Sequence, residues 1–191
     1  MKVNQISNFI LASFLFIFCS KNNDSNNVTT PIDVSAQWKT DALGDLLSGL
    51  SDQQWQAKIF NSAEQNLFNS LDTANLSGTT TPGAVLEIPY RYNCIYPTPF
   101  NSQFQMTFRF TAGFSGQFVF KCVIVDSLMN PIDKKTAKLQ ATVYPGPGNS
   151  SSTTIAIMPN VPIGRFRLYF TLSSQANAPF YKSWGNIQRN L

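Results

Sequence analysis

Residues 104–126 read FQMTFRFTAGFSGQFVFKCVIVD, and this stretch decides the fold class. Its first half carries apolar side chains at every second position, namely Phe104, Met106, Phe108 and Phe110. A period of two predicts a strand with one buried and one wet face. Residues 118–125 are apolar on both faces except at Lys121, which is typical of a central strand covered on both sides. Gly113 and Gly116 predict a tight reversal, so that the two strands form a hairpin.

Further strands are expected on both sides of this stretch, because two strands cannot shield four phenylalanines from water. Alternating or apolar runs occur at residues 85–92, 138–143, 155–157, 166–172 and 180–187. Pro89 cannot donate to a ladder, which places its strand at a sheet edge or a bulge. Glycine- and proline-rich turns separate the runs. We therefore predict a mainly all-β fold, an Ig-like or fibronectin-like antiparallel β-sandwich of about seven strands.

The N-terminal part of the domain has weaker patterns. Asp41 is expected to cap a short helix within residues 41–50, and the alternation of residues 54–59 indicates a strand. Ser62 and Gln65 match a capping box, which predicts one or two helical turns. The buried face of these turns is expected to consist of Leu67, Phe68 and Leu71.

Residues 1–18 have the pattern of a signal peptide. Lys2 precedes a ten-residue apolar run, Phe9–Phe18, which is too short to span a bilayer as a helix. Cys19 follows, and then the polar tract SKNNDSNNVTT. This arrangement resembles a bacterial lipoprotein signal, and CSKNNDSNN is similar to the leader of Bacteroidetes lipoproteins. Phe18 departs from the pattern, since such signals place Gly, Ala or Ser before the cysteine.

The resemblance implies that Cys19 carries a diacylglycerol and becomes the mature N-terminus at the outer membrane. The alternative is plain secretion, with Cys19 removed or free. Residues 19–33 then form a lipidated N-terminus and flexible tether, and residues 34–191 form a single β-sandwich domain.

A second resemblance covers residues 95–131. IYPTPFNSQFQMTFRF, followed by an apolar strand ending in VIVDSLMNP, is similar to the YPNPF opening and hairpin of type IX secretion C-terminal sorting domains. Those are small β-sandwiches of Bacteroidetes. A sorting domain ends its chain, whereas 60 residues follow Pro131 here. The resemblance therefore implies an Ig-like strand arrangement and not a sorting role.

The chemistry available to the chain is restricted. The sequence has no histidine, no CxxC pair and no phosphate-binding glycine motif. Its acids lie mostly before residue 90 and in turns, without the pairing that glycoside cleavage needs. We expect no enzymatic activity, no cofactor and no metal site. Asp126, Asn130 and Asp133 are interpreted as turn formers rather than calcium ligands.

Two cysteines remain besides Cys19. Export favours disulfides, so a Cys94–Cys122 bridge is predicted. Two separate buried thiols that act as small hydrophobes are the alternative.

Charge is unevenly distributed along the chain. Residues 19–90 carry 3 basic and 8 acidic side chains, whereas residues 91–191 carry 10 basic and only 2 acidic ones. The inward parity of residues 166, 168, 170 and 172 predicts that Arg165, Arg167 and Tyr169 project outward together. With Tyr181 and Trp184 of the last strand, they form the candidate binding surface. Arginines that only keep an exposed strand soluble are the competing interpretation.

We interpret the chain as a lipid-anchored cell-envelope module that binds or spaces a protein partner without catalysis. The alternative is a glycan-binding lipoprotein of a polysaccharide-uptake system, in which Trp38, Trp55, Tyr181 and Trp184 would stack on sugar rings. Nucleic acid is not an expected partner.

Overall fold

The structure is a computed structural model that describes residues 30–41, 43, 45–48, 54–71, 86–87, 95–110, 116–143, 151–174 and 179–191. The signal peptide, Cys19, Cys94 and the expected reversal at Gly113 lie outside these residues. No helix in the described ranges is long and apolar enough to cross a membrane.

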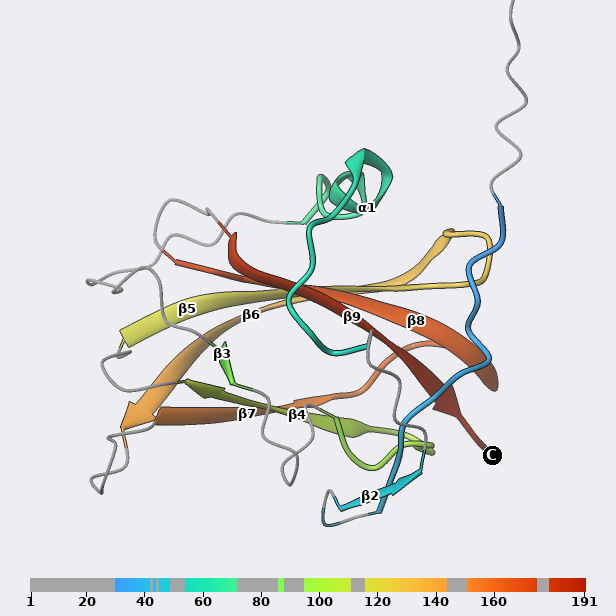
Figure 1. Ribbon diagram of the computed structural model, residues 1–191, viewed down its shortest axis with the longest axis horizontal. Helices are drawn as coiled ribbons and strands as arrows, with labels where there is room; N and C mark the ends of the chain where they lie inside the picture. Colours follow the sequence, from blue (N-terminus) through green and yellow to red (C-terminus); the bar gives the residue numbers. More distant parts are fainter. Residues whose placement is uncertain are drawn as a thin grey trace, which may run out of the picture.

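The predicted all-β class is confirmed. Within the described residues, seven strands form one curled antiparallel sheet in the order β3-β4-β7-β6-β5-β8-β9 (Figure 1). Their bounds are β3 Leu86–Glu87, β4 Phe104–Phe110, β5 Gly116–Val125, β6 Pro131–Val143, β7 Ser151–Ile157, β8 Gly164–Ser173 and β9 Pro179–Arg189. β1 (Lys39–Thr40) pairs with β2 (Leu46–Ser48) separately, and α1 spans Ser62–Asn66.

The sheet folds over onto itself through β6. This strand pairs with β5 over most of its length, and then with β7 only at Thr142 and Val143. As a result, β3, β4 and β7 lie in one layer and β5, β8 and β9 in the other (Figure 1). Phe108 of β4 contacts Phe120 of β5 and Phe170 of β8, each with ring centroids 5.6 Å apart. The two layers therefore share one aromatic core, as in a sandwich.

The predicted hairpin of β4 and β5 is wrong. β4 is hydrogen-bonded to β3 and β7, and β5 to β6 and β8. The two strands face each other across the core, where Phe110 and Phe118 lie 5.3 Å apart. Packing face to face buries both rows of phenylalanines, whereas side-by-side pairing would leave them on one uncovered surface. The predicted alternation is confirmed, since Phe104, Met106, Phe108 and Phe110 are all buried.

Two predicted elements of the N-terminal part are also wrong. The described residues within 41–48 are not helical: Asp41 Oδ1 accepts hydrogen bonds from the backbone of Leu43 and Asp45, which makes the turn before β2. Residues 54–59 do not form a strand, because Trp55 has a φ of 63°. They nevertheless follow β9, where the backbone N–H groups of Trp55 and Lys58 donate to Trp184 and Lys182.

The predicted helical turns after residue 61 are confirmed. The capping box forms one residue earlier than predicted, between Asn61 and Glu64. Leu67 is buried, and Phe68 and Leu71 pack partly buried beside it.

A second apolar cluster lies on the outer side of the β5–β8–β9 layer. Its buried members are Phe60, Leu67, Val123, Val125 and Tyr169. Figure 1 shows α1 and its flanking loop above this layer. The outer face of the layer is thus covered by residues 54–71, which confirms that β5 is a central strand buried on both faces.

Candidate functional site

The predicted binding surface on β8 is largely covered. Arg165 is exposed, but Arg167 is only 9% and Tyr169 only 1% exposed. The three side chains share the outward parity that the sequence predicts. The prediction that they form a solvated row is wrong, because segments 30–38 and 54–71 pack over Arg167 and Tyr169.

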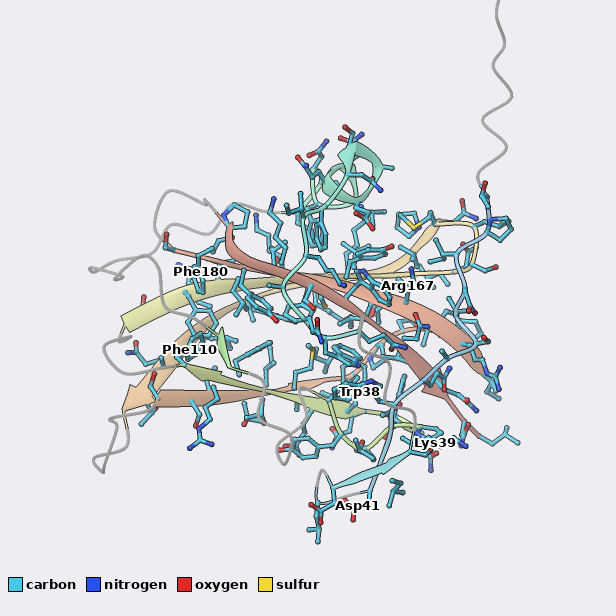
Figure 2. All side chains as sticks on the ribbon, in the orientation of Figure 1. Trp38, Lys39, Asp41, Phe110, Arg167 and Phe180 are labelled. Carbon is cyan, nitrogen blue, oxygen red and sulfur yellow. The ribbon has the colours of Figure 1, made fainter. Side chains whose placement is uncertain are left out.

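Arg167 fastens the N-terminal segment to the sheet. Its Nε donates to Asn186 Oδ1 at 2.9 Å, and its Nη2 donates to the backbone oxygen of Asp33. The Asn186 side-chain amide donates in turn to the backbone oxygens of Ala36, at 2.7 Å, and Asp33, at 3.2 Å. Arg167 lies beside the segment that it holds, to the left of it in Figure 2. Its hydrogen-bonding capacity is therefore directed at the protein itself.

The aromatic residues of the predicted surface are likewise used inside the molecule. Tyr181 points into the core and its hydroxyl donates to the backbone oxygen of Trp55 at 3.1 Å. Trp55 is fully buried and lies 6.4 Å from Trp38 in an edge contact. Trp184 is half-buried beneath the Arg167 guanidinium, 3.9 Å from its ring centroid. These rings therefore do not form the flat stacking surface that the glycan alternative requires.

A hollow of about 210 Å³ opens nearer the start of β9 on the same outer face. The loop that begins with α1 contributes one side, and β5, β8 and β9 contribute the floor. Its lining residues are Phe60, Gln65, Phe68, Asn69, Lys121, Thr171, Ser173, Pro179 and Lys182. We call it the Lys121 hollow.

The floor of the Lys121 hollow follows from strand register. Lys121 of β5 is paired with Thr171 of β8, and Thr171 with Lys182 of β9. Residues in register on neighbouring strands project from the same face, so two ammonium groups flank one hydroxyl. No carboxylate is among the lining residues. The Lys121 hollow is therefore a cationic site.

Lys121 itself is only 8% exposed. Across the described part of the chain the Lys121 side chain has no hydrogen bond and no ion pair; the ion pair found there joins Lys135 to Asp133 at 3.1 Å. In the sequence, Lys121 was visible as the interruption of an apolar strand, but its neighbours on β8 and β9 could not be inferred from that position alone.

A second hollow of about 230 Å³ adjoins the first. Residues 57–59 line one side of it and residues 179–182 the other. Pro179 and Lys182 line both hollows. Lys58 also lines the second one, with its Nζ 5.7 Å from the Trp184 ring centroid, and we call this second one the Lys58 hollow.

The predicted disulfide is not present at Cys122. Cys122 carries a free thiol, and its side chain faces the sandwich core, where it is fully buried. Burial raises the pKa of this thiol to about 12. Cys94 lies outside the described residues.

The two acids interpreted as turn formers accept backbone hydrogen bonds, Asp126 within its own turn and Asp133 also from the segment after β7. Asp126 Oδ1 accepts hydrogen bonds from the backbone of Leu128 and Asn130. Asp133 accepts hydrogen bonds from the backbone of Lys134 and Asn160. Both carboxylates therefore shape the turns at the ends of β5, β6 and β7.

Comparisons with known proteins add little. No family model matches the chain, and no curated protein matches it. A glycosyl hydrolase family 2 member from Bacteroides cellulosilyticus is similar in structure at 9% identity and a TM-score of 0.32, covering 57% of this chain and 14% of that enzyme. A mutant (D270A) β-glucosidase from Listeria innocua in complex with laminaribiose is similar at 10% identity and a TM-score of 0.35, covering 60% and 17%. The chain thus spans less than a fifth of either enzyme, and likeness at this level supports no statement about function.

Proposed function

We propose that this chain is a non-catalytic binding module of the cell envelope that takes an anionic ligand in the Lys121 hollow. In this proposal a lipid on Cys19 holds the module at the outer membrane, and the residues between Cys19 and the packed segment 30–38 act as the tether. The observation that carries the proposal is Lys121, a residue only 8% exposed whose ammonium group has no acidic partner in the described residues.

The energetic argument concerns the surroundings of the Lys121 ammonium group. The aliphatic part of this side chain is buried, and the ammonium group reaches water only within the hollow, where it lacks an opposite charge. Val119 and Val123, which flank Lys121 on the same strand face, are fully buried and supply no compensation. An anionic group of a ligand would supply it, and the hydroxyls of Thr171 and Ser173 are additional donors.

The size of the site favours a small group over a protein surface. The protein-partner interpretation depended on a solvated row at Arg167 and Tyr169, which are buried. The Lys121 hollow, at about 210 Å³, instead suits a single charged group with a few neighbouring atoms. The stacking rings of the glycan alternative are used inside the molecule as well, so the size of the hollow is what favours a small ligand group.

Isothermal titration of the full chain, purified in detergent, tests the proposal. Three anionic probes are used: sodium sulfate, galacturonate and tetragalacturonate. We expect binding that weakens as salt rises, and a loss of about tenfold or more in Lys121→Gln, the size expected for one charged hydrogen bond. Lys138→Gln is the matched control, because Lys138 is exposed on the adjacent strand β6. Absence of binding by all three probes, or unchanged binding in Lys121→Gln, would overturn the proposal.

A further inference from the structure

We infer that the ligand of the Lys121 hollow is an acidic sugar within a glycan chain, whose acid group lies between Lys121 and Lys182 and whose next unit enters the Lys58 hollow. This inference rests on the proposed function. Three observations support it: amide oxygens near the two lysines, phenyl rings near the two lysines, and the adjoining Lys58 hollow.

The first observation is a pair of amide oxygens on the loop side of the Lys121 hollow. Gln65 Nε2 donates to the backbone oxygen of Phe60 at 2.7 Å, and Asn69 Nδ2 donates to Asn66 Oδ1 at 3.1 Å. The side-chain oxygens of Gln65 and Asn69 accept no hydrogen bond from any described residue. Amide oxygens are acceptors, which repel a bare anion and bind hydroxyl donors. The hollow therefore suits a ligand that carries hydroxyl groups as well as negative charge.

The second observation is the position of the rings relative to the cations. Phe60 and Phe68 stack 5.9 Å apart with an interplanar angle of 15°, and both line the hollow. Lys182 Nζ lies 6.0 Å from the Phe60 ring centroid. An acid group at Lys182 would thus bring the atoms attached to it against the phenyl side chains. A sugar acid has this combination, since its C–H face is apolar and its carboxylate or sulfate is charged.

The third observation is that the two hollows are neighbours with a common cation. Lys182 lines both, while Lys121 belongs to the first and Lys58 to the second. The Lys58 backbone N–H donates to the Lys182 backbone oxygen at 2.8 Å, which fixes the loop beside β9. Phe180, which is partly exposed, lines the second hollow. Each of the two neighbouring hollows is thus lined by lysine and phenylalanine side chains. A glycan chain with an acid group on each unit could place one unit in each hollow.

The test compares four probes on the full chain in detergent: galacturonate, tetragalacturonate, sulfate and neutral maltotetraose. We expect tetragalacturonate to bind about tenfold or more tightly than galacturonate, because a second charged contact is added. Galacturonate should bind more tightly than sulfate. Gln65→Leu and Asn69→Leu should weaken galacturonate without weakening sulfate. Lys58→Gln should weaken tetragalacturonate only, and Lys138→Gln should change nothing.

The outcomes separate this inference from the proposed function. Sulfate that binds as tightly as galacturonate, with no effect of Gln65→Leu, would overturn the sugar inference and leave anion binding standing. Equal affinity for the monomer and the tetramer would overturn the glycan-chain part. If maltotetraose binds as tightly as tetragalacturonate, and Lys121→Gln leaves both affinities unchanged, both the inference and the proposed function are overturned.

Discussion

The guanidinium carbon of Arg167 lies 3.9 Å from the ring centroid of Trp184, the residue diagonally across from it on β9. The same guanidinium reaches the Asn186 side chain and the backbone of Asp33. One side chain thus joins β8, β9 and the segment through which the proposed tether enters the domain. It stabilises the fold at this point and does not form a free surface.

Replacement of Arg167 is therefore expected to destabilise the protein. Arg167→Ala removes two charged hydrogen bonds and the contact with Trp184, which we expect to lower the free energy of unfolding by about 2–4 kcal/mol. Urea denaturation measures the change. Arg165→Ala, at an exposed position of the same strand, should stay within about 0.5 kcal/mol of the wild type. Equal effects of the two substitutions would contradict the assignment.

The backbone of Gly185 lies directly against the ring of Trp55, which leaves no room for a side chain at residue 185. A Cβ atom at residue 185 would lie 2.0 Å from the Trp55 ring, which is fully buried and cannot move aside freely. We expect Gly185→Ala to destabilise by about 3 kcal/mol or more, at the upper end of overpacking effects. Trp55→Leu in the same chain should reduce the penalty of Gly185→Ala, because it vacates the space. If the double variant loses as much melting temperature as the two single variants together, the result argues against this contact.

Cys122 is expected to behave as an inert, unbridged thiol. Native protein should resist alkylation at Cys122 at pH 8, because the pKa of this thiol is raised to about 12 by burial and the reactive thiolate is scarce. Unfolding in urea should make it reactive without a reducing agent. A non-reducing peptide map that links Cys122 to Cys94 would refute this expectation.

The same thiol predicts a pH dependence. Its pKa in the folded protein lies above the ordinary value of 9.0, so the folded state holds the proton more tightly. Its contribution to stability is complete below about pH 9 and decreases as pH rises toward 12. Cys122→Val should lack this contribution to the alkaline slope. Parallel unfolding curves for the variant and the wild type between pH 9 and 11 would contradict it.

The lipid anchor is tested at Cys19. If Cys19 is acylated, the wild-type protein should partition into detergent and incorporate labelled palmitate, and Cys19→Ala should lose both properties. A water-soluble wild-type protein whose mature N-terminus lies elsewhere would rule the anchor out.

Local patterns predicted which side chains turn inward, but not which strands or segments cover them. The alternation at Phe104–Phe110 and Phe166–Leu172 identified two rows of core residues correctly, because burial on one face is a local property of a strand. The pairing partners of β4 could not be inferred in this way, since β7 is some 40 residues distant along the chain, as their paired residues Phe110 and Ser151 show. The covering of Arg167 and Tyr169 by segments 30–38 and 54–71 is likewise non-local.

The candidate site illustrates the same limit. Lys121 is conspicuous within an otherwise apolar run, which indicated an unusual position in the sequence. Its significance depends on Thr171 and Lys182 in register beside it, and on Gln65 and Asn69 from the covering loop. These residues come together only when three strands and the α1 loop are assembled.

The most direct test of the central claim is the melting temperature of Lys121→Met with and without tetragalacturonate. Methionine keeps the length of the side chain and removes its charge. If the Lys121 ammonium group lacks a compensating charge in the ligand-free protein, the ligand-free variant should be at least as stable as the wild type, with a gain of up to about 1 kcal/mol, roughly 2–4 °C. Tetragalacturonate should raise the melting temperature of the wild type and of Lys138→Met by similar amounts, and raise that of Lys121→Met clearly less. A lower melting temperature in ligand-free Lys121→Met, together with an undiminished rise on adding tetragalacturonate, would contradict the account.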